Sequence, residues 1–129
     1  MEIKLIINQK LILTFIFISI SIVGFMIKLP FVFRHHDKEL HSLFYFCAAL
    51  FLNVMFVKRH LIIFFSLLFF GVVIEFIQEY SNRLFRRRIH GNLDKEDIYS
   101  NLKGLIFFTI IWLVLSFTSY LYNKLIINK

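Results

Sequence analysis

Four long apolar runs constrain this chain more than any other feature of its sequence. A helix that crosses a hydrocarbon core of about 30 Å needs about 20 mostly apolar residues, at about 1.5 Å per residue. Runs close to that length occupy residues 11–33, 39–57, 61–80 and 98–122. Hydrophobic residues make up 59% of the sequence, whereas soluble domains average about 45–50%. We therefore expect an all-α integral membrane bundle of four transmembrane helices, with residues 1–129 forming a single domain.

Basic residues lie almost wholly outside these runs, and the chain has a formal net charge of +7. Because little surface is left to face water, we expect no nucleic-acid partner. The expected partners are membrane lipids, polyprenyl phosphates or other anionic head groups among them, and a membrane-protein partner is also compatible. The single cysteine, Cys47, excludes an intrachain disulfide and a metal site built from cysteines. These features predict a multi-pass protein of the cell membrane.

Topology brings the polar residues of the chain to one end of the expected bundle. We expect the first helix to continue past Lys28 and Pro30 to Phe33. The turn at residues 58–60 is so short that the second and third helices must be antiparallel. The second helix then starts, the third ends and the fourth starts at one membrane face. The polar residues of that face are Asp37, Lys38, His41, Glu75, Gln78, Asp94, Asp97 and Asn101.

The spacing of these residues places them on shared helix faces, because side chains three or four positions apart are neighbours on a helix. The stripes with that spacing are Asp37 with His41, Glu75 with Gln78, and Asp94 with Asp97 and Asn101. If all of them face inward, they can bind a polar head group, a cation or a proton in transit.

Glu75 is the most informative of these residues. It follows the uncharged stretch 61–74 and therefore lies within the third span, toward its polar end. A carboxylate at mid-membrane depth costs about 2.5–3.5 kcal/mol on insertion scales, so such residues usually face the bundle interior and mark function. The alternative is a structural carboxylate that only holds a neighbouring helix.

The candidate catalytic residues are His41, Glu75 and Asp97, as acid or base. An aspartate at a helix start is also a good N-cap, and His41 alone can be a core histidine. A divalent cation on His41, Asp37, Glu75 and Asp97 is conceivable from the ligand types. The spacing matches no metal motif, however, so the sequence favours a site without metal or cofactor.

A basic cluster follows the third apolar run, at Arg83, Arg86, Arg87 and Arg88. Such a cluster is most often a loop that contacts solvent or head groups. The alternative is a phosphate clamp, because a guanidinium fork binds phosphate bidentately. We include Arg83 and Arg88 among the expected ligand-binding residues.

At these residues the chain resembles the VanZ-like family of small membrane proteins. One signature of that family, Asp-Lys-x-x-His at the start of the second helix, reads Asp37-Lys38-Glu39-Leu40-His41 here. The other matches at Glu75, Gln78, Asp97, Asn101 and Gly104, with Asp94 at a preceding acidic position. The stretch between Gln78 and Asp94 is longer than usual, so the arginine of the family pattern has several candidates.

The resemblance implies a place in the bacterial inner membrane and an association with resistance to glycopeptide antibiotics such as teicoplanin. The expected function is the binding of an envelope lipid or head group at a polar intramembrane site. The alternatives are a membrane enzyme acting on a lipid-linked phosphate and a subunit of a larger membrane complex. The sequence shows no nucleophile motif, which favours binding over catalysis.

Overall fold

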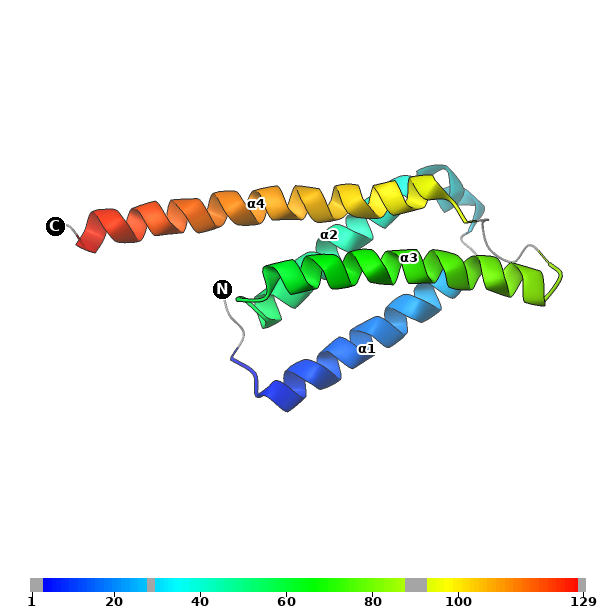
Figure 1. The fold of residues 1–129 in the computed structure, drawn as a ribbon, viewed down its shortest axis with the longest axis horizontal. Helices are drawn as coiled ribbons and strands as arrows, with labels where there is room; N and C mark the ends of the chain where they lie inside the picture. Colours follow the sequence, from blue (N-terminus) through cyan, green and yellow to red (C-terminus); the bar gives the residue numbers. More distant parts are fainter. Residues whose placement is uncertain (1–3, 28–29, 88–92, 128–129) are drawn as a thin grey trace.

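The computed structural model describes residues 4–27, 30–87 and 93–127, and within these ranges the chain is all-helical. Its elements, in order, are α1 (Ile7–Met26), the short 3-10 helix η1 (Phe31–His36), α2 (Asp37–Met55), α3 (His60–Leu84) and α4 (Lys95–Ile127). Successive α helices run in opposite directions, so α1 begins and α4 ends on the same side of the molecule (Figure 1). The antiparallel arrangement expected for the second and third helices is confirmed.

Within the described ranges three helices, α1, α3 and α4, are long and apolar enough to cross a membrane. The fourth, α2, has 19 residues and begins with the charged turn Asp37-Lys38-Glu39. It also carries the buried polar residues His41 and Asn53, which lowers its apolar character. The protein therefore has the helical architecture and composition of a membrane protein, with polar residues concentrated at the start of α2.

The first helix ends earlier than the sequence predicts. It stops at Met26, and Ile27 is extended, with φ −84° and ψ 135°. Proline has no backbone N–H and disfavours the helical conformation of the residue before it. After Pro30 the chain forms η1, so the apolar residues that follow do not lengthen α1.

The last helix is longer than the apolar run that predicts it. With 33 residues, α4 measures about 50 Å at about 1.5 Å per residue. Its C-terminal half projects beyond the other helices (Figure 1), and residues 113–127 are all exposed. Most of these exposed side chains are apolar, as expected for a helix surrounded by lipid.

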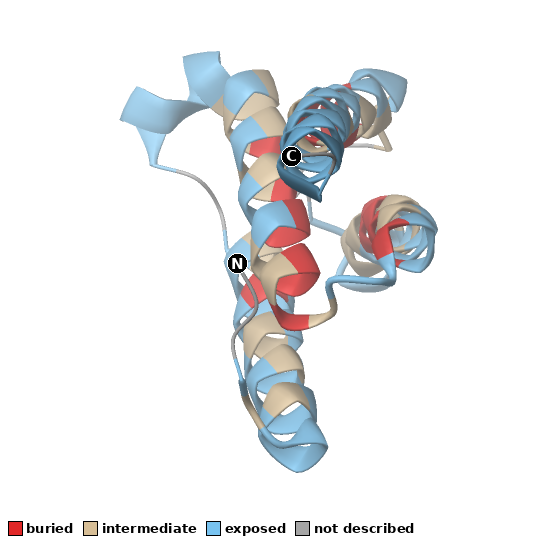
Figure 2. Ribbon diagram, turned by 90° about the vertical axis from the view of Figure 1, so that its left-hand side faces the viewer, coloured by how far each residue is buried: buried red, intermediate tan, exposed pale blue. Residues whose placement is uncertain are grey.

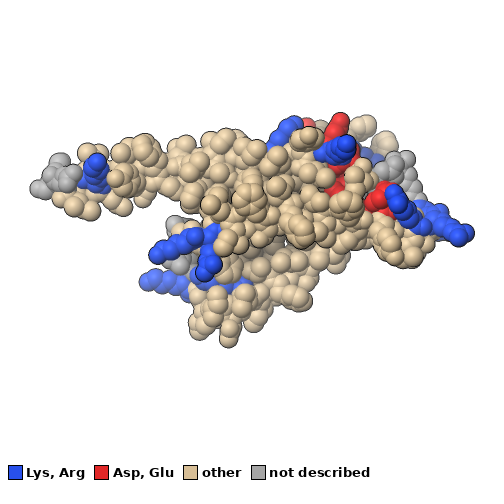
Figure 3. Space-filling model, viewed as in Figure 1, with Lys and Arg blue, Asp and Glu red and all other residues tan. Residues whose placement is uncertain are grey.

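The core lies between α2, α3 and α4, and the most extensive helix contact joins α2 to α4. The buried residues lie on the sides of the helices that face one another, while the outer sides are exposed (Figure 2). The apolar core consists of Tyr45, Ala48, Ala49, Leu52, Met55, Ile63, Leu67, Leu105 and Phe108. Figure 3 shows the acidic side chains gathered at one end of the molecule, where α2 and α4 begin and α3 ends.

Candidate functional site

The site is built on a close contact between α2 and α4. Gly104 of α4 lies so near Ser42 of α2 that a Cβ atom at position 104 would overlap the Ser42 backbone carbonyl. One turn earlier on α4, the carbonyl of Ser100 accepts a hydrogen bond of 2.7 Å from Ser42 Oγ. This approach brings the polar stripe of α4 against the polar first turns of α2.

Lys38 joins the beginnings of the two helices. Its ammonium group donates to the carboxylate of Asp94 and, at 2.5 Å, to Asp97 Oδ1, and Glu96 Oε2 lies 3.8 Å away. Burial alone would lower the pKa of Lys38, but the hydrogen bonds and charges of Asp94 and Asp97 raise it above its ordinary value. The bonds from Lys38 and from the Glu96 amide hold the pKa of Asp94 below its ordinary value. Both groups therefore remain charged and attract each other.

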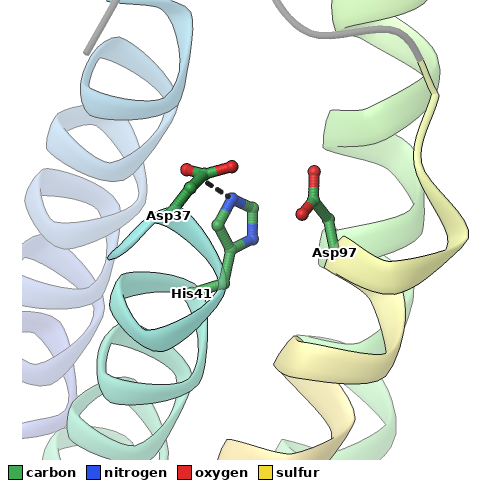
Figure 4. A group of neighbouring side chains, drawn as sticks. All are labelled: Asp37, His41 and Asp97. Atoms are coloured by element: carbon green, nitrogen blue, oxygen red, sulfur yellow. Dashed lines mark ion pairs between the residues drawn. The ribbon is translucent and has the colours of Figure 1, made fainter. Parts of the chain in front are cut away.

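His41 occupies the next turn of α2 and is buried. Its Nδ1 lies 2.8 Å from Asn101 Oδ1, and because an amide oxygen only accepts, Nδ1 is the donor in this bond. Nε2 faces Asp37 Oδ1 at 3.7 Å. The Asp97 carboxylate faces the ring from α4, across the gap between the helices (Figure 4). One ligand atom from each of Asp37, His41 and Asp97 lies within 4.8 Å of the other two.

Glu75 brings α3 into the site, and it is only 1% exposed. Its Oε2 accepts a hydrogen bond of 3.4 Å from the backbone N–H of Asp94, and the charges of Asp97 and His41 act on its carboxyl group. Its Oε1 and the hydroxyl of Tyr45 are buried without a hydrogen-bond partner among the described residues. Buried orphan polar atoms are uncommon in native proteins. They mark a place where a water, an ion or a ligand group is needed.

Gly71 allows α3 to approach the other two helices. A Cβ atom at this position would lie 2.7 Å from Asn101 Nδ2 and 2.8 Å from the Tyr45 hydroxyl. Side chains of α2 and α4 therefore meet the α3 backbone at one level, one turn from Glu75. The expected convergence of three polar stripes is found for most of their residues.

Two of the expected residues point elsewhere. Gln78 donates through Nε2 to the carbonyl of Phe25, at 2.7 Å, so it ties α3 to the end of α1. Arg83 is exposed and donates through Nε to Glu79 Oε1 at 3.0 Å. Of the other predicted arginines, Arg86 and Arg87 are exposed, and Arg88 lies outside the described residues.

Arg83 does line a pocket beside the buried cluster. The pocket has a volume of about 460 Å³ and is lined by Phe76, Glu79, Tyr80, Arg83 and Leu93. Leu93 directly precedes Asp94, and its N–H donates to Glu79 Oε2 at 3.3 Å. The predicted ligand residues are thus divided between a buried cluster and an adjoining pocket with an arginine at its edge.

One aspartate is a helix cap and another is not. The Oδ1 atom of Asp94 accepts a hydrogen bond of 2.9 Å from the N–H of Glu96, which caps the start of α4. Asp37 is the first residue of α2, and the residue before it makes no side-chain cap bond. Within the described residues the Asp37 carboxylate makes no capping bond, and it faces His41.

A second polar network, at the opposite end of the bundle, was missed from the sequence. His60 Nδ1 lies 3.0 Å from Asn53 Oδ1, and Nε2 lies 3.2 Å from Thr109 Oγ1. The ring of His60 stacks on Trp112 with centroids 4.2 Å apart. Asn53 inside an apolar run was the available signal, but it does not reveal its partners.

The chain was also compared with protein-family models, curated proteins and solved structures, and none of them matches it. The resemblance to the VanZ-like family therefore stays a prediction that rests on the motifs.

Proposed function

We propose that this chain is a four-span, VanZ-like protein of the bacterial inner membrane that binds the phosphate-bearing head group of an envelope lipid. In this proposal α2 is the fourth span, and its charged first turn lies at the membrane surface. The up-and-down order of the helices supports this, because α1 and α3 can cross the membrane only if α2 returns between them. Through the head group, the protein contributes to glycopeptide resistance.

The observation that carries the proposal is the pocket beside the buried cluster. Its volume of about 460 Å³ falls within the range of about 300–1,000 Å³ typical of small-molecule sites. Phe76, Tyr80 and Leu93 give it apolar walls, and Arg83 stands at its edge. A guanidinium fork recognises phosphate bidentately, and tyrosine is enriched at the level of lipid head groups. An amphiphile with a phosphate at its polar end fits this combination.

The bond from Arg83 to Glu79 also orients the guanidinium group, since Glu79 is itself fixed by the Leu93 amide. Orientation before binding lowers the ordering cost that a flexible side chain would otherwise incur. The pocket therefore presents the Arg83 guanidinium in one position at its edge.

Lipid titration of the purified protein in nanodiscs tests the proposal. We expect saturable binding of a polyprenyl phosphate and much weaker binding of the matching neutral polyprenol. Arg83→Gln should weaken phosphate-lipid binding by roughly tenfold or more, the value of one charge-assisted bidentate contact. Arg59→Gln is the matched control, because Arg59 is exposed in the turn at the opposite end of the bundle. Equal binding of the two lipids, or an unchanged affinity in Arg83→Gln, contradicts the proposal.

A resistance assay tests the cellular part. Expression of the wild-type chain in a glycopeptide-susceptible bacterium should raise the inhibitory concentration of teicoplanin. Arg83→Gln, produced at the same level in the membrane, should not. If both proteins or neither protect the cells, the link between head-group binding and resistance is wrong.

A further inference from the structure

The gap between the first turns of α2 and α4 has the composition and geometry of a metal site. Asp37, His41 and Asp97 each present a ligand atom, all within 4.8 Å of one another. His41 Nε2 lies 3.7 Å from Asp37 Oδ1. Two ligand atoms at about 2.1 Å from a tetrahedral ion are about 3.4 Å apart, so the three side chains must come closer together than the 4.8 Å limit for one ion to reach all of them.

The orientation of His41 favours a metal. Metal-binding histidines usually donate their other ring N–H to an oxygen, which fixes the tautomer and the ring position. Here Nδ1 donates to Asn101 Oδ1 at 2.8 Å. Nε2 is the ring nitrogen left to bind an ion, and it faces the carboxylate of Asp37, with the carboxylate of Asp97 facing the same ring (Figure 4).

Charge balance supports a cation at this position. Four carboxylates meet here, from Asp37, Glu75, Asp94 and Asp97. Against them stands the ammonium of Lys38, which bonds to Asp94 and Asp97. Burying carboxylates without compensation is costly, and a divalent ion would offset most of the excess. Lys38 donates to only one oxygen of the Asp97 carboxylate, Oδ1. A carboxylate has two oxygens with about four acceptor sites in total.

Glu75 supplies an independent observation. Its side chain comes from a third helix, is 1% exposed, and is held beside the cluster by the Asp94 amide. Its second oxygen, Oε1, is buried and has no partner among the described residues. An ion with its bound water between α2 and α4 would provide that partner.

We infer that Asp37, His41 and Asp97 bind one divalent first-row transition-metal ion, with Glu75 contributing a further carboxylate from α3. The mixture of imidazole and carboxylate ligands suits Zn²⁺ or Mn²⁺ better than Mg²⁺ or Ca²⁺, which prefer oxygen ligands alone. The ion would join three helices at the polar end of the bundle. The sequence favoured a site without metal because its ligands come from two separate helices, with no local motif.

Metal binding to the whole chain in detergent tests the inference, with Zn²⁺ and Mn²⁺ themselves as the probes. After removal of metal with a chelator, equilibrium dialysis and elemental analysis should show one ion per chain. Bound ion should raise the thermal unfolding midpoint, since a ligand that binds only the folded state stabilises it. This measurement needs no substitution, so the absence of saturable wild-type binding at millimolar metal overturns the inference. Binding of Mg²⁺ as tight as that of Zn²⁺ and Mn²⁺ also overturns it.

Variants locate the ion. Asp37→Asn is the mildest, because Asp37 is partly exposed and does not cap its helix, and it should weaken binding by roughly tenfold or more. His41→Gln should do the same, while His36→Gln is the control, since His36 lies on the surface of the same region. Unchanged affinity in both Asp37→Asn and His41→Gln, or equal loss in His36→Gln, places the ion elsewhere and refutes the site.

The proposed metal site and the proposed lipid pocket can be tested separately. Arg83 has no part in the metal site, so Arg83→Gln should bind Zn²⁺ like the wild type. Loss of lipid binding with intact metal binding therefore concerns the proposed function alone. Loss of metal binding in Arg83→Gln would contradict the separation of the two sites.

Discussion

Replacing glycine by alanine at three positions should change stability in a defined order, because the glycines have different surroundings. A Cβ atom at position 104 would overlap backbone atoms of Ser42 on the neighbouring helix. At Gly71 the nearest atoms are the ends of two side chains, at 2.7 and 2.8 Å. At Gly24 no atom lies within 4 Å of the added carbon. Only the first contact is between two helix backbones.

The expected magnitudes follow from two opposing effects. Alanine favours a helix interior over glycine by about 1 kcal/mol, so Gly24→Ala should raise the free energy of unfolding by up to about that amount. At Gly104 the overlap can be relieved only by moving α2 away from α4, at an overpacking cost of about 1–3 kcal/mol or more. The movement also weakens the bond from Ser42 to Ser100, worth about 1 kcal/mol. The net loss for Gly104→Ala is then about 1–3 kcal/mol.

Gly71→Ala should fall between these two. Its neighbours are the Asn101 amide and the Tyr45 hydroxyl, and side-chain ends shift at lower cost than backbone. Asn101 is held by His41, however, and Tyr45 is fully buried, so the relief is incomplete. We expect a loss of about 0–1.5 kcal/mol after the gain in helix propensity is subtracted.

Unfolding in mixed micelles, with a denaturing detergent as titrant, measures the three free energies. The chain has one tryptophan, and Trp112 stacks on His60 within the bundle, so its fluorescence reports separation of α3 and α4. Circular dichroism follows the loss of helix in parallel. A Gly104→Ala protein as stable as wild type refutes the close α2–α4 contact. An equal loss in Gly24→Ala would show that the effect is not one of packing.

Three further substitutions test single interactions of the site by the same unfolding assay. Glu75→Gln should leave the free energy of unfolding of the metal-free protein unchanged or higher while weakening metal binding, because Glu75 has no ion pair with a lysine or arginine among the described residues and Asp97 repels it. A loss of about 3–5 kcal/mol would indicate a buried ion pair instead. Lys38→Met should lower the free energy of unfolding by about 1–2 kcal/mol, a value between those of surface and buried ion pairs. The reason is that its partner Asp97 is buried while the Lys38 side chain is 38% exposed. No loss of stability would mean that solvent fully screens the pair. Ser42→Ala should cost about 0.5–1.5 kcal/mol by removing one hydrogen bond to α4, and a neutral result would show that Ser42 does not hold the helices together.

Much of the local structure was predictable from the sequence alone. Apolar runs and charged breaks predicted four α helices, and the short turn fixed the antiparallel order of α2 and α3. The spacing of Asp97, Asn101 and Gly104 predicted one face of α4, and all three are buried there. The suitability of aspartate as an N-cap predicted that one of the aspartates caps a helix, and Asp94 does so. Each of these follows from helix periodicity or from backbone groups within a few residues.

Local sequence predicted helix ends and side-chain directions less well. Residues 31–33 are as apolar as those of α1, but Pro30 separates them from the helix, and they enter η1 instead. Gln78 shares its spacing with Glu75, yet its amide bonds to the end of α1. Residues three positions apart lie on the same side of a helix but do not point in the same direction, so they can contact different neighbouring helices.

Tertiary structure decided which side chains share a site. Periodicity fixes the positions of residues around one helix, but it does not fix how that helix is rotated against another or how closely the two approach. Here the missing side chain of Gly104 lets α2 and α4 meet at Ser42, and that contact sets the register of the polar stripes. It brings Asp97 to His41 and leaves Arg83 outside, in a pocket of its own. The sequence determined which residues are polar, helical and at one end, and the packing of the helix backbones selected those that touch.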